Sequence, residues 1–183
     1  HTILPTPTQF WGLCGDHGAL ISASDGHHNY FITHNCNNDA NTYRVDITLD
    51  QAGKTEAEQI AANQVLLQGV FDKTGDGHLS AVSKGPHQDW VFADIETFSD
   101  DPFNGTPSGW APYEQEIVAI NVVTLEVRRY AHHRSRGLDT SGDYYYAQPR
   151  ISCSWDGSVV LWTSNFNIAA PVGYADLYAM SFP

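Results

Sequence analysis

Residues 147–165 have the sequence AQPRISCSWDGSVVLWTSN, in which two largely apolar stretches flank the dipeptide Asp156-Gly157. Asp-Gly between alternating apolar residues predicts a β-hairpin, because the tight turn needs a positive φ that glycine adopts readily. The pattern occurs twice earlier, in DHGALISASDGHHNYFITHN at 16–35 and in DGHLSAVSKGPHQDWVFADI at 76–95. The expected turns of these two copies are Asp25-Gly26 and Lys84-Gly85. The chain therefore contains three copies of one hairpin repeat.

Further apolar stretches extend each repeat into an antiparallel sheet. The added strands are expected at 42–48 in the first repeat, 116–123 and 126–133 in the second, and 175–182 in the third. Three or four antiparallel strands per repeat is the plan of a propeller blade. The sequence therefore predicts an all-β fold, a β-propeller segment of about three four-stranded blades. The expected blades span about 14–50, 74–133 and 145–183.

The distances between the turns leave room for two insertions, which we place at about 50–70 and 97–114. Good helix formers dominate KTEAEQIAANQVLLQ at 54–68 and predict a helix, although a loop followed by an outer strand fits the same stretch. A closed propeller has roughly four to eight blades, so three blades do not close a ring. We therefore expect the C-terminal part of a larger propeller, or a propeller that other chains complete.

The composition is typical of a folded domain and excludes two classes of partner. Hydrophobic residues make up 42% of the 183 residues and charged residues 16%. No apolar run approaches the roughly 18 residues of a membrane helix, so we expect no membrane span. The formal net charge of −12 opposes binding to phosphate backbones and argues against nucleic acid.

No signal peptide is visible, so the chain is expected to be cytosolic or already processed.

Two of the three cysteines indicate the compartment. Cys14 and Cys36 flank the first hairpin at positions that nearly face each other across its two strands. Such a placement permits a disulfide, which requires an oxidising environment. We therefore expect a secreted, extracellular or periplasmic protein. Cys153 is left over and is expected to be a small buried residue.

The last repeat, SCSWDGSVVLWTSN followed by ADLYAMSF, resembles the SPDG-type repeat of TolB-like, WD40-like propellers. GDGHLS around His78, AHHRS around His132 and YAQPR around Gln148 are similar to segments of oligogalacturonate lyases, which are SPDG-type propellers. That resemblance implies a divalent metal held by His and Gln side chains near the channel. The metal binds the uronate carboxylate and acidifies the α-proton for β-elimination. This chain departs from the family after Gln148, where Pro149 and Arg150 replace histidines and one expected ligand is lost.

Aligning the three hairpins on their glycine turns places polar residues at equivalent positions before each turn. His17, Asp76 and Gln148 stand eight residues before it, and His78 and Arg150 stand six before it. Residues two apart share a strand face and the first strand of each blade lines the channel, so these groups are expected at one channel mouth. The candidate ligands of a manganese or calcium ion are His78, His132, Gln148, His17 and Asp76.

Three functions remain open at this stage. The first is an extracellular carbohydrate-active propeller, a metal-dependent lyase-like protein that acts on or binds anionic sugars. In it Arg134 and Arg150 would hold a carboxylate and Tyr146 would stack on a sugar ring. The second is a non-catalytic module that binds glycans or proteins. The third is a copper-dependent polysaccharide monooxygenase with a histidine brace at His1, for which His87 and Tyr174 are the candidate partners.

Overall fold

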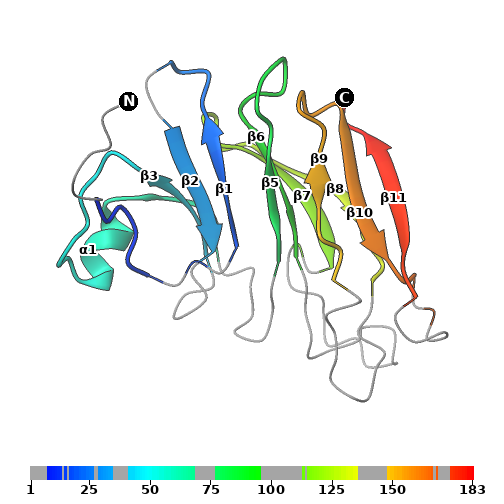
Figure 1. Ribbon diagram of the computed structural model, residues 1–183, viewed down its shortest axis with the longest axis horizontal. Helices are drawn as coiled ribbons and strands as arrows, with labels where there is room; N and C mark the ends of the chain where they lie inside the picture. The colour runs from blue at the N-terminus through cyan, green and yellow to red at the C-terminus, as the bar shows by residue number, and fades with distance from the viewer. Residues whose placement is uncertain are drawn as a thin grey trace.

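The protein is almost entirely β structure in the part of the chain that its computed structural model describes. The described residues are 8–13, 15, 17–26, 29–34, 41–68, 77–95, 113, 115–135, 148–166, 168 and 174–183. Strands account for 44% of these residues and helix for 5%. The strands form three separate antiparallel sheets that follow one another along the longest axis of the molecule (Figure 1). The predicted all-β fold is confirmed.

Each sheet is built from strands that are consecutive in the chain, and neighbouring strands are antiparallel. Sheet 1 contains β1 (Gly18–Ser22), β2 (Asn29–His34), β3 (Thr42–Asp46) and β4 (Gln64–Leu67). Sheet 2 contains β5 (Leu79–Ala81), β6 (Trp90–Asp94), β7 (Glu116–Asn121) and β8 (Val127–His132). Sheet 3 contains β9 (Ser152–Cys153), β10 (Val159–Ser164) and β11 (Asp176–Ser181). This meander order is the plan of a propeller blade.

Two of the three predicted hairpin turns lie where the sequence indicates. The register of β1 with β2 is centred on Asp25-Gly26, and that of β9 with β10 on Asp156-Gly157. Gly26 and Gly157 both have a φ of 74°, which explains the choice of glycine. The second hairpin differs: Leu79 faces Ala93, so its longer turn is centred on Pro86 and not on Lys84-Gly85.

The stretch 54–68 forms both structures that its sequence allows. It begins with α1 (Glu56–Ala61), which is capped by Thr55 and Glu58 in a reciprocal capping box. The hydrogen bonds from Thr55 lower the pKa of the Glu58 carboxyl. β4 then pairs with β3 as the fourth strand of sheet 1. The part of the stretch 50–70 that forms β4 therefore belongs to sheet 1, as the alternative of an outer strand allows.

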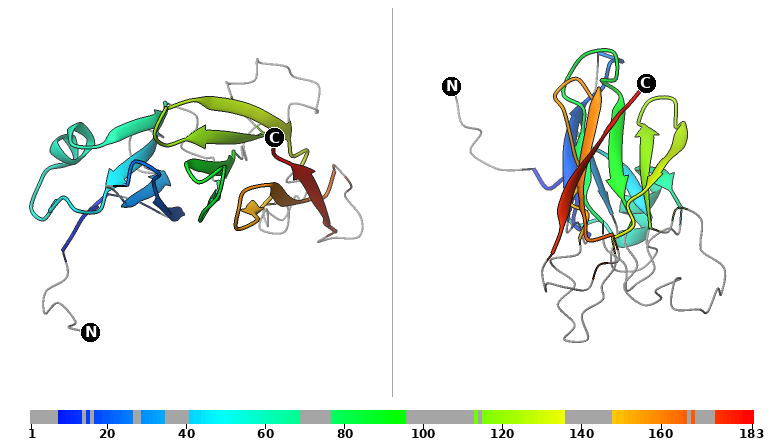
Figure 2. Two further views of the ribbon diagram at one scale, coloured as in Figure 1. Left: turned by 90° about the horizontal axis from the view of Figure 1, so that it is seen from above. Right: turned by 90° about the vertical axis from the view of Figure 1, so that its right-hand side faces the viewer.

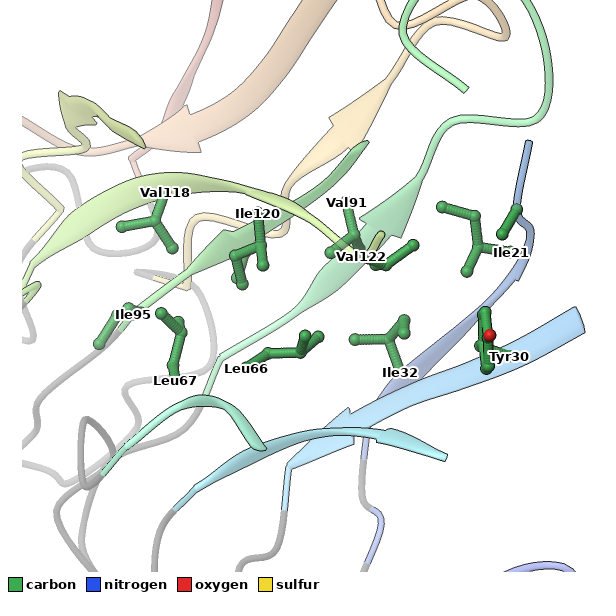
Figure 3. Close-up of a cluster of buried hydrophobic side chains, with 12 residues drawn as sticks. Ile21, Tyr30, Ile32, Leu66, Leu67, Val91, Ile95, Val118, Ile120 and Val122 are labelled. Carbon is green, nitrogen blue, oxygen red and sulfur yellow. The ribbon is translucent and has the colours of Figure 1, made fainter. Parts of the chain in front are cut away.

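The core consists of two layers of apolar side chains between neighbouring sheets. In β6, Val91 and Ala93 face sheet 1, whereas Trp90 and Phe92 face sheet 3. Figure 3 shows the first layer, in which side chains of sheet 2 lie opposite side chains of sheet 1. Because both faces of sheet 2 are covered, β6 is buried over its whole length.

The three sheets are arranged as successive blades. The inner strands are neighbours, since β5 contacts both β1 and β9. Seen from above, these inner strands lie along one side and β8 and α1 along the other (left panel of Figure 2). This arrangement confirms a β-propeller segment of three blades, of which the third has three strands in the described part of the chain.

Several predictions concern residues that lie outside the described ranges. Cys14, Cys36 and almost all of 97–114 are among them, so the predicted disulfide and the second insertion stay predictions. Cys153 is a free thiol and is half-buried, with its Sγ 3.3 Å from the Oγ of Ser80. No helix in the described ranges is long and apolar enough to cross a membrane.

Candidate functional site

The strand register shows which residues occupy equivalent positions at the start of the inner strands. They differ from the residues that the alignment on glycine turns made equivalent. Gly18 faces Thr33, so one residue further from the turn His17 lies opposite His34. In sheet 2, the N–H of Asp94 donates to the carbonyl of His78 at 3.2 Å, so these two residues face each other. His78 is therefore the counterpart of His17. The alignment on glycine turns is wrong here because the second turn is longer.

His17 and His78 meet at the junction of sheets 1 and 2. Their ring centroids are 4.3 Å apart, with an angle of 39° between the ring planes. His34, which lies opposite His17 in sheet 1, is 6% exposed and has its Nδ1 3.1 Å from the Oγ1 of Thr42. Burial lowers the pKa of His34 to about 3, against a smaller opposing effect of the Asp94 carboxylate; His17 and His78 lower it further. His34 is therefore a neutral imidazole at physiological pH.

The carboxylate of Asp94 is fully buried and connects two blades. Its Oδ1 accepts the backbone N–H of His78 at 2.6 Å, and its Oδ2 accepts the backbone N–H of Ile151 at 2.8 Å. The Nδ1 of His78 also lies 3.5 Å from Oδ1. One carboxyl group therefore holds the starts of the inner strands of sheets 2 and 3 together. It brings the backbone of Arg150, next to Ile151, close to that of His78.

These contacts define a candidate site with one basic residue from each blade. We call it the inner-strand basic cluster; its members are His17, His78 and Arg150. Arg150 is exposed and has a φ of 48°, an unusual backbone conformation for a residue other than glycine. Gln148, two residues earlier, is half-buried, and its carbonyl accepts the hydroxyl of Thr163 at 2.8 Å.

His132 does not join this cluster. It ends β8, and β6 and β7 lie between β8 and the inner strand β5. Neighbouring strands are about 4.8 Å apart, so His132 is about 14 Å from His78. Its Nε2 lies 3.5 Å from Oε1 of the buried Glu116, which also accepts two bonds from Arg129. Those bonds raise the pKa of Arg129. No sequence pattern indicates this ion-pair role of Glu116, because its partners come from the neighbouring strand β8.

The described residues do not supply the predicted metal site. Among them, no group of three His, Cys, Asp or Glu side chains is arranged to hold a metal ion. His17 and His78 provide two imidazoles, whereas a protein metal site normally uses three or four ligands. Asp76 and Tyr146 lie outside the described ranges. The predicted combination of His78 with His132 is not assembled, and we derive no reaction step through a metal.

The segment after β8 links sheets 2 and 3. The guanidinium carbon of Arg134 is 5.7 Å from the centre of the Phe166 ring, and the side chain is exposed. His133 is 1% exposed; its Nε2 lies 3.1 Å from the carbonyl of Ile95, and its Nδ1 accepts the N–H of Ser135 at 3.1 Å. These partners fix a neutral ring with the proton on Nε2. His133 therefore has a structural role, which its position beside His132 does not indicate.

The structure separates the two candidate copper partners. His87 lies in the second hairpin turn, and its ring is 5.1 Å from that of Phe182, just after β11. Tyr174 lies before β11 and donates its hydroxyl to Asp176. The two side chains are thus at opposite ends of this strand and cannot share a metal ion. His1 lies outside the described ranges.

A cavity of about 350 Å³ opens on sheet 1, away from the inner-strand basic cluster. Its lining residues are Tyr30, Arg44, Asp46, Leu49, Ala61, Ala62, Asn63 and Gln64. Arg44 stacks 4.6 Å over the Tyr30 ring and donates to the carbonyl of Val122, and Asn63 accepts the N–H of Asp46 at 3.1 Å. Because these polar groups already bond within the protein, the cavity is a weaker candidate for ligand binding.

Comparisons with known proteins give few matches. No family model and no curated protein matches the chain. Among solved structures, oligogalacturonate lyase from Vibrio parahaemolyticus is similar with a TM-score of 0.47 and 13% identity, over 90% of this chain and 35% of that one. TolB from Acinetobacter baumannii is similar with a TM-score of 0.43 and 15% identity, over 90% of this chain and 29% of that one. The chain thus spans about a third of their length. They are the two kinds of propeller that the repeat resembles.

Proposed function

We propose that this protein is part of an extracellular β-propeller that binds anionic sugars at the end where its inner strands begin. The observation that supports the proposal is the ring contact of His17 with His78, together with the buried Asp94 carboxylate, which accepts the backbone N–H groups of His78 and of Ile151, the residue after Arg150. The chain has a net charge of −12, so neighbouring basic residues are unusual in it. Such a group of basic side chains would attract a carboxylate.

The expected ligand is a uronate, whose carboxylate and hydroxyl groups suit these side chains. The planar guanidinium of Arg150 can bind both oxygens of a carboxylate at once. The Nδ1 of His78 lies 3.5 Å from Oδ1 of Asp94, which orients the imidazole ring at the start of the inner strand. His17, in ring contact with His78, adds a second imidazole. The proposal is for binding alone, since the described residues supply no metal-ligand set for β-elimination.

Titration calorimetry with trigalacturonate, and with the neutral galactotriose as reference, tests this function. Arg150→Ala should weaken trigalacturonate binding at least about 10-fold, because a hydrogen bond to a charged group is worth about 1.5–3 kcal/mol. Lys84→Ala is the matched control: it removes the same charge from the exposed turn of the second hairpin, at the opposite end of the sheet.

Two results would refute the proposal. One is the absence of any preference for trigalacturonate over galactotriose. The other is an equal loss of affinity in Arg150→Ala and Lys84→Ala, because general electrostatic attraction would then account for binding. The extracellular location is a separate part of the proposal. It requires Cys14 and Cys36 to resist alkylation until the protein is reduced.

A further inference from the structure

Arg134 is an exposed residue whose backbone is fixed on both sides. Its neighbours His133 and Ser135 are buried, and the N–H of Ser135 donates to the Nδ1 of His133 at 3.1 Å. The Nε2 of His133 lies 3.1 Å from the carbonyl of Ile95. Arg134 itself has a φ of 58°, a backbone conformation that residues other than glycine rarely adopt and that occurs often at binding sites. The link between sheets 2 and 3 therefore holds Arg134 in one place at the surface.

An aromatic stack supports the side chain of Arg134. Its guanidinium carbon lies 5.7 Å from the centre of the Phe166 ring, which is 39% exposed. The Phe166 ring contacts that of Tyr178, with centroids 4.7 Å apart, and Tyr178 stacks on the buried Trp162 at 6.1 Å. Contact with a ring restricts a guanidinium without using its N–H groups. Arg134 therefore presents an ordered guanidinium to solvent.

Arg128 shows what distinguishes Arg134 from another arginine that lies over a ring. The guanidinium carbon of Arg128 is 4.6 Å from the centre of the Trp90 ring, and its Nε donates to Oε1 of Glu126 at 2.7 Å. In the part of the chain that the structure describes, the guanidinium of Arg134 has a ring contact but no hydrogen-bond acceptor. The N–H donors of Arg134 are therefore available to an anion.

The Phe166 ring under Arg134 lies at the same end of the sheets as Arg150. The register of β9 with β10 places Thr163 opposite Arg150, and the N–H of Thr163 donates to the carbonyl of Pro149 at 2.6 Å. Phe166 follows Thr163 by three residues, past the end of β10 that lies where β1 begins (Figure 1). Three residues span at most about 11 Å and neighbouring strands are about 5 Å apart, so the backbones of Arg150 and Phe166 are within about 16 Å of each other.

We propose that Arg134 is a second anion-binding residue at this end, and that the ligand is an oligosaccharide with acidic groups on at least two rings. The proposal rests on the proposed function, in which Arg150 binds one carboxylate. The two guanidinium groups come from separate segments, and Phe166 supports only that of Arg134. Two such groups at a distance favour an extended chain with two acidic groups over a sugar with one.

Titration calorimetry with trigalacturonate, and with trigalacturonate in which two of the three carboxylates are methyl esters, tests the proposal. The original protein should bind the triacid at least about 10-fold more tightly, because the diester loses a contact between a guanidinium and a carboxylate. Arg134→Ala should lose most of this preference. Alanine and arginine tolerate a positive φ equally poorly and the side chain is exposed, so this variant should fold like the original chain.

Arg128→Ala is the matched control. It removes a guanidinium that also lies over a ring, but at the start of β8, whereas Arg134 follows the end of that strand. It should keep the full preference for the triacid. An equal loss of preference in Arg128→Ala and Arg134→Ala would overturn the proposal, because general electrostatic attraction would then account for it.

Two further outcomes would overturn the proposal. One is equal affinity of the original protein for the triacid and the diester. The other is an Arg134→Ala variant that keeps the full preference. If trigalacturonate is still preferred over galactotriose and Arg150→Ala weakens its binding, either outcome refutes the second anion-binding residue alone. Failure of the proposed function is a different result, in which trigalacturonate is not preferred over galactotriose at all.

Discussion

At the scale of single residues, Asp94 determines how the inner strands meet. Replacing Asp94 with Ala removes the acceptor for the N–H groups of His78 and Ile151. Each donor left without a partner costs about 1–3 kcal/mol, so we expect the free energy of unfolding to fall by about 2–6 kcal/mol. Denaturant unfolding measures this change. Asp94→Asn keeps one oxygen and should lose less; equal losses would mean that the hydrogen bonds are not the cause.

His34 predicts how stability depends on pH. Its pKa is about 3 in the folded protein and 6.5 in the reference state, so the unfolded chain binds a proton more readily. The free energy of unfolding should therefore fall as pH drops from 6.5 towards 3, by up to about 1.4 kcal/mol per pH unit, and this contribution is constant above that window. Asp156, whose pKa is lowered from 3.8 to about 2 by its bonds to Ser158 and Ser154, adds its own loss of stability only as pH falls below about 4.

Thermal unfolding between pH 7.5 and 5 measures the effect of His34. His34→Gln keeps a polar group for Thr42 and does not titrate, so its midpoint should change less with pH than that of the original chain. Parallel pH profiles for the two proteins would contradict the assignment. In that case the other histidines would account for the pH dependence.

At the scale of elements, the hairpin turns offer a matched pair of glycines. Gly26 and Gly157 share a φ of 74°, but a Cβ on Gly26 would meet nothing within 4 Å. A Cβ on Gly157 would lie 2.6 Å from Cγ2 of Val82 and 2.9 Å from Cβ of His87. Gly26→Ala should cost about 1–2 kcal/mol for the positive φ alone, and Gly157→Ala at least about 1 kcal/mol more. Equal costs in denaturant unfolding would show that the third turn does not pack on sheet 2.

The sequence predicts those features of the elements that depend on local signals, and not those that depend on turn length or on contacts between blades. Asp-Gly turns and strand periodicity predict two hairpins in the correct register, because both signals are local. Turn length is not encoded so simply: the second turn is longer, and the alignment misplaced His78 by two residues. Asp94 accepts a backbone hydrogen bond from the neighbouring blade, and no local sequence pattern indicates such a contact. The strand predicted at 126–133 is the fourth of its sheet. The sequence alone therefore places His132 on an outer strand, away from the channel.

At the scale of the whole molecule, the two terminal sheets differ in how their outward faces are covered. The face of sheet 1 that points away from sheet 2 is covered by the chain itself. There Phe10 contacts Phe31 with ring centroids 5.6 Å apart, Trp11 contacts Tyr43 at 5.5 Å, and Tyr43 is fully buried. On the corresponding face of sheet 3, Leu177 is 67% exposed. Further blades of a larger propeller would therefore be expected to pack against sheet 3.

This asymmetry predicts a gradient of local stability. Sheet 2 is packed on both faces, whereas sheet 3 is packed on one, so sheet 3 should open without global unfolding. In hydrogen exchange, the amides of Val118 and Ile120 should be protected at least about 100-fold more than those of Tyr178 and Met180, which are bonded to β10. Tyr43 in sheet 1 should exchange slowly because its face is covered. Equal protection in sheets 2 and 3 would mean that the three blades unfold as one unit and that the open face is no weak point.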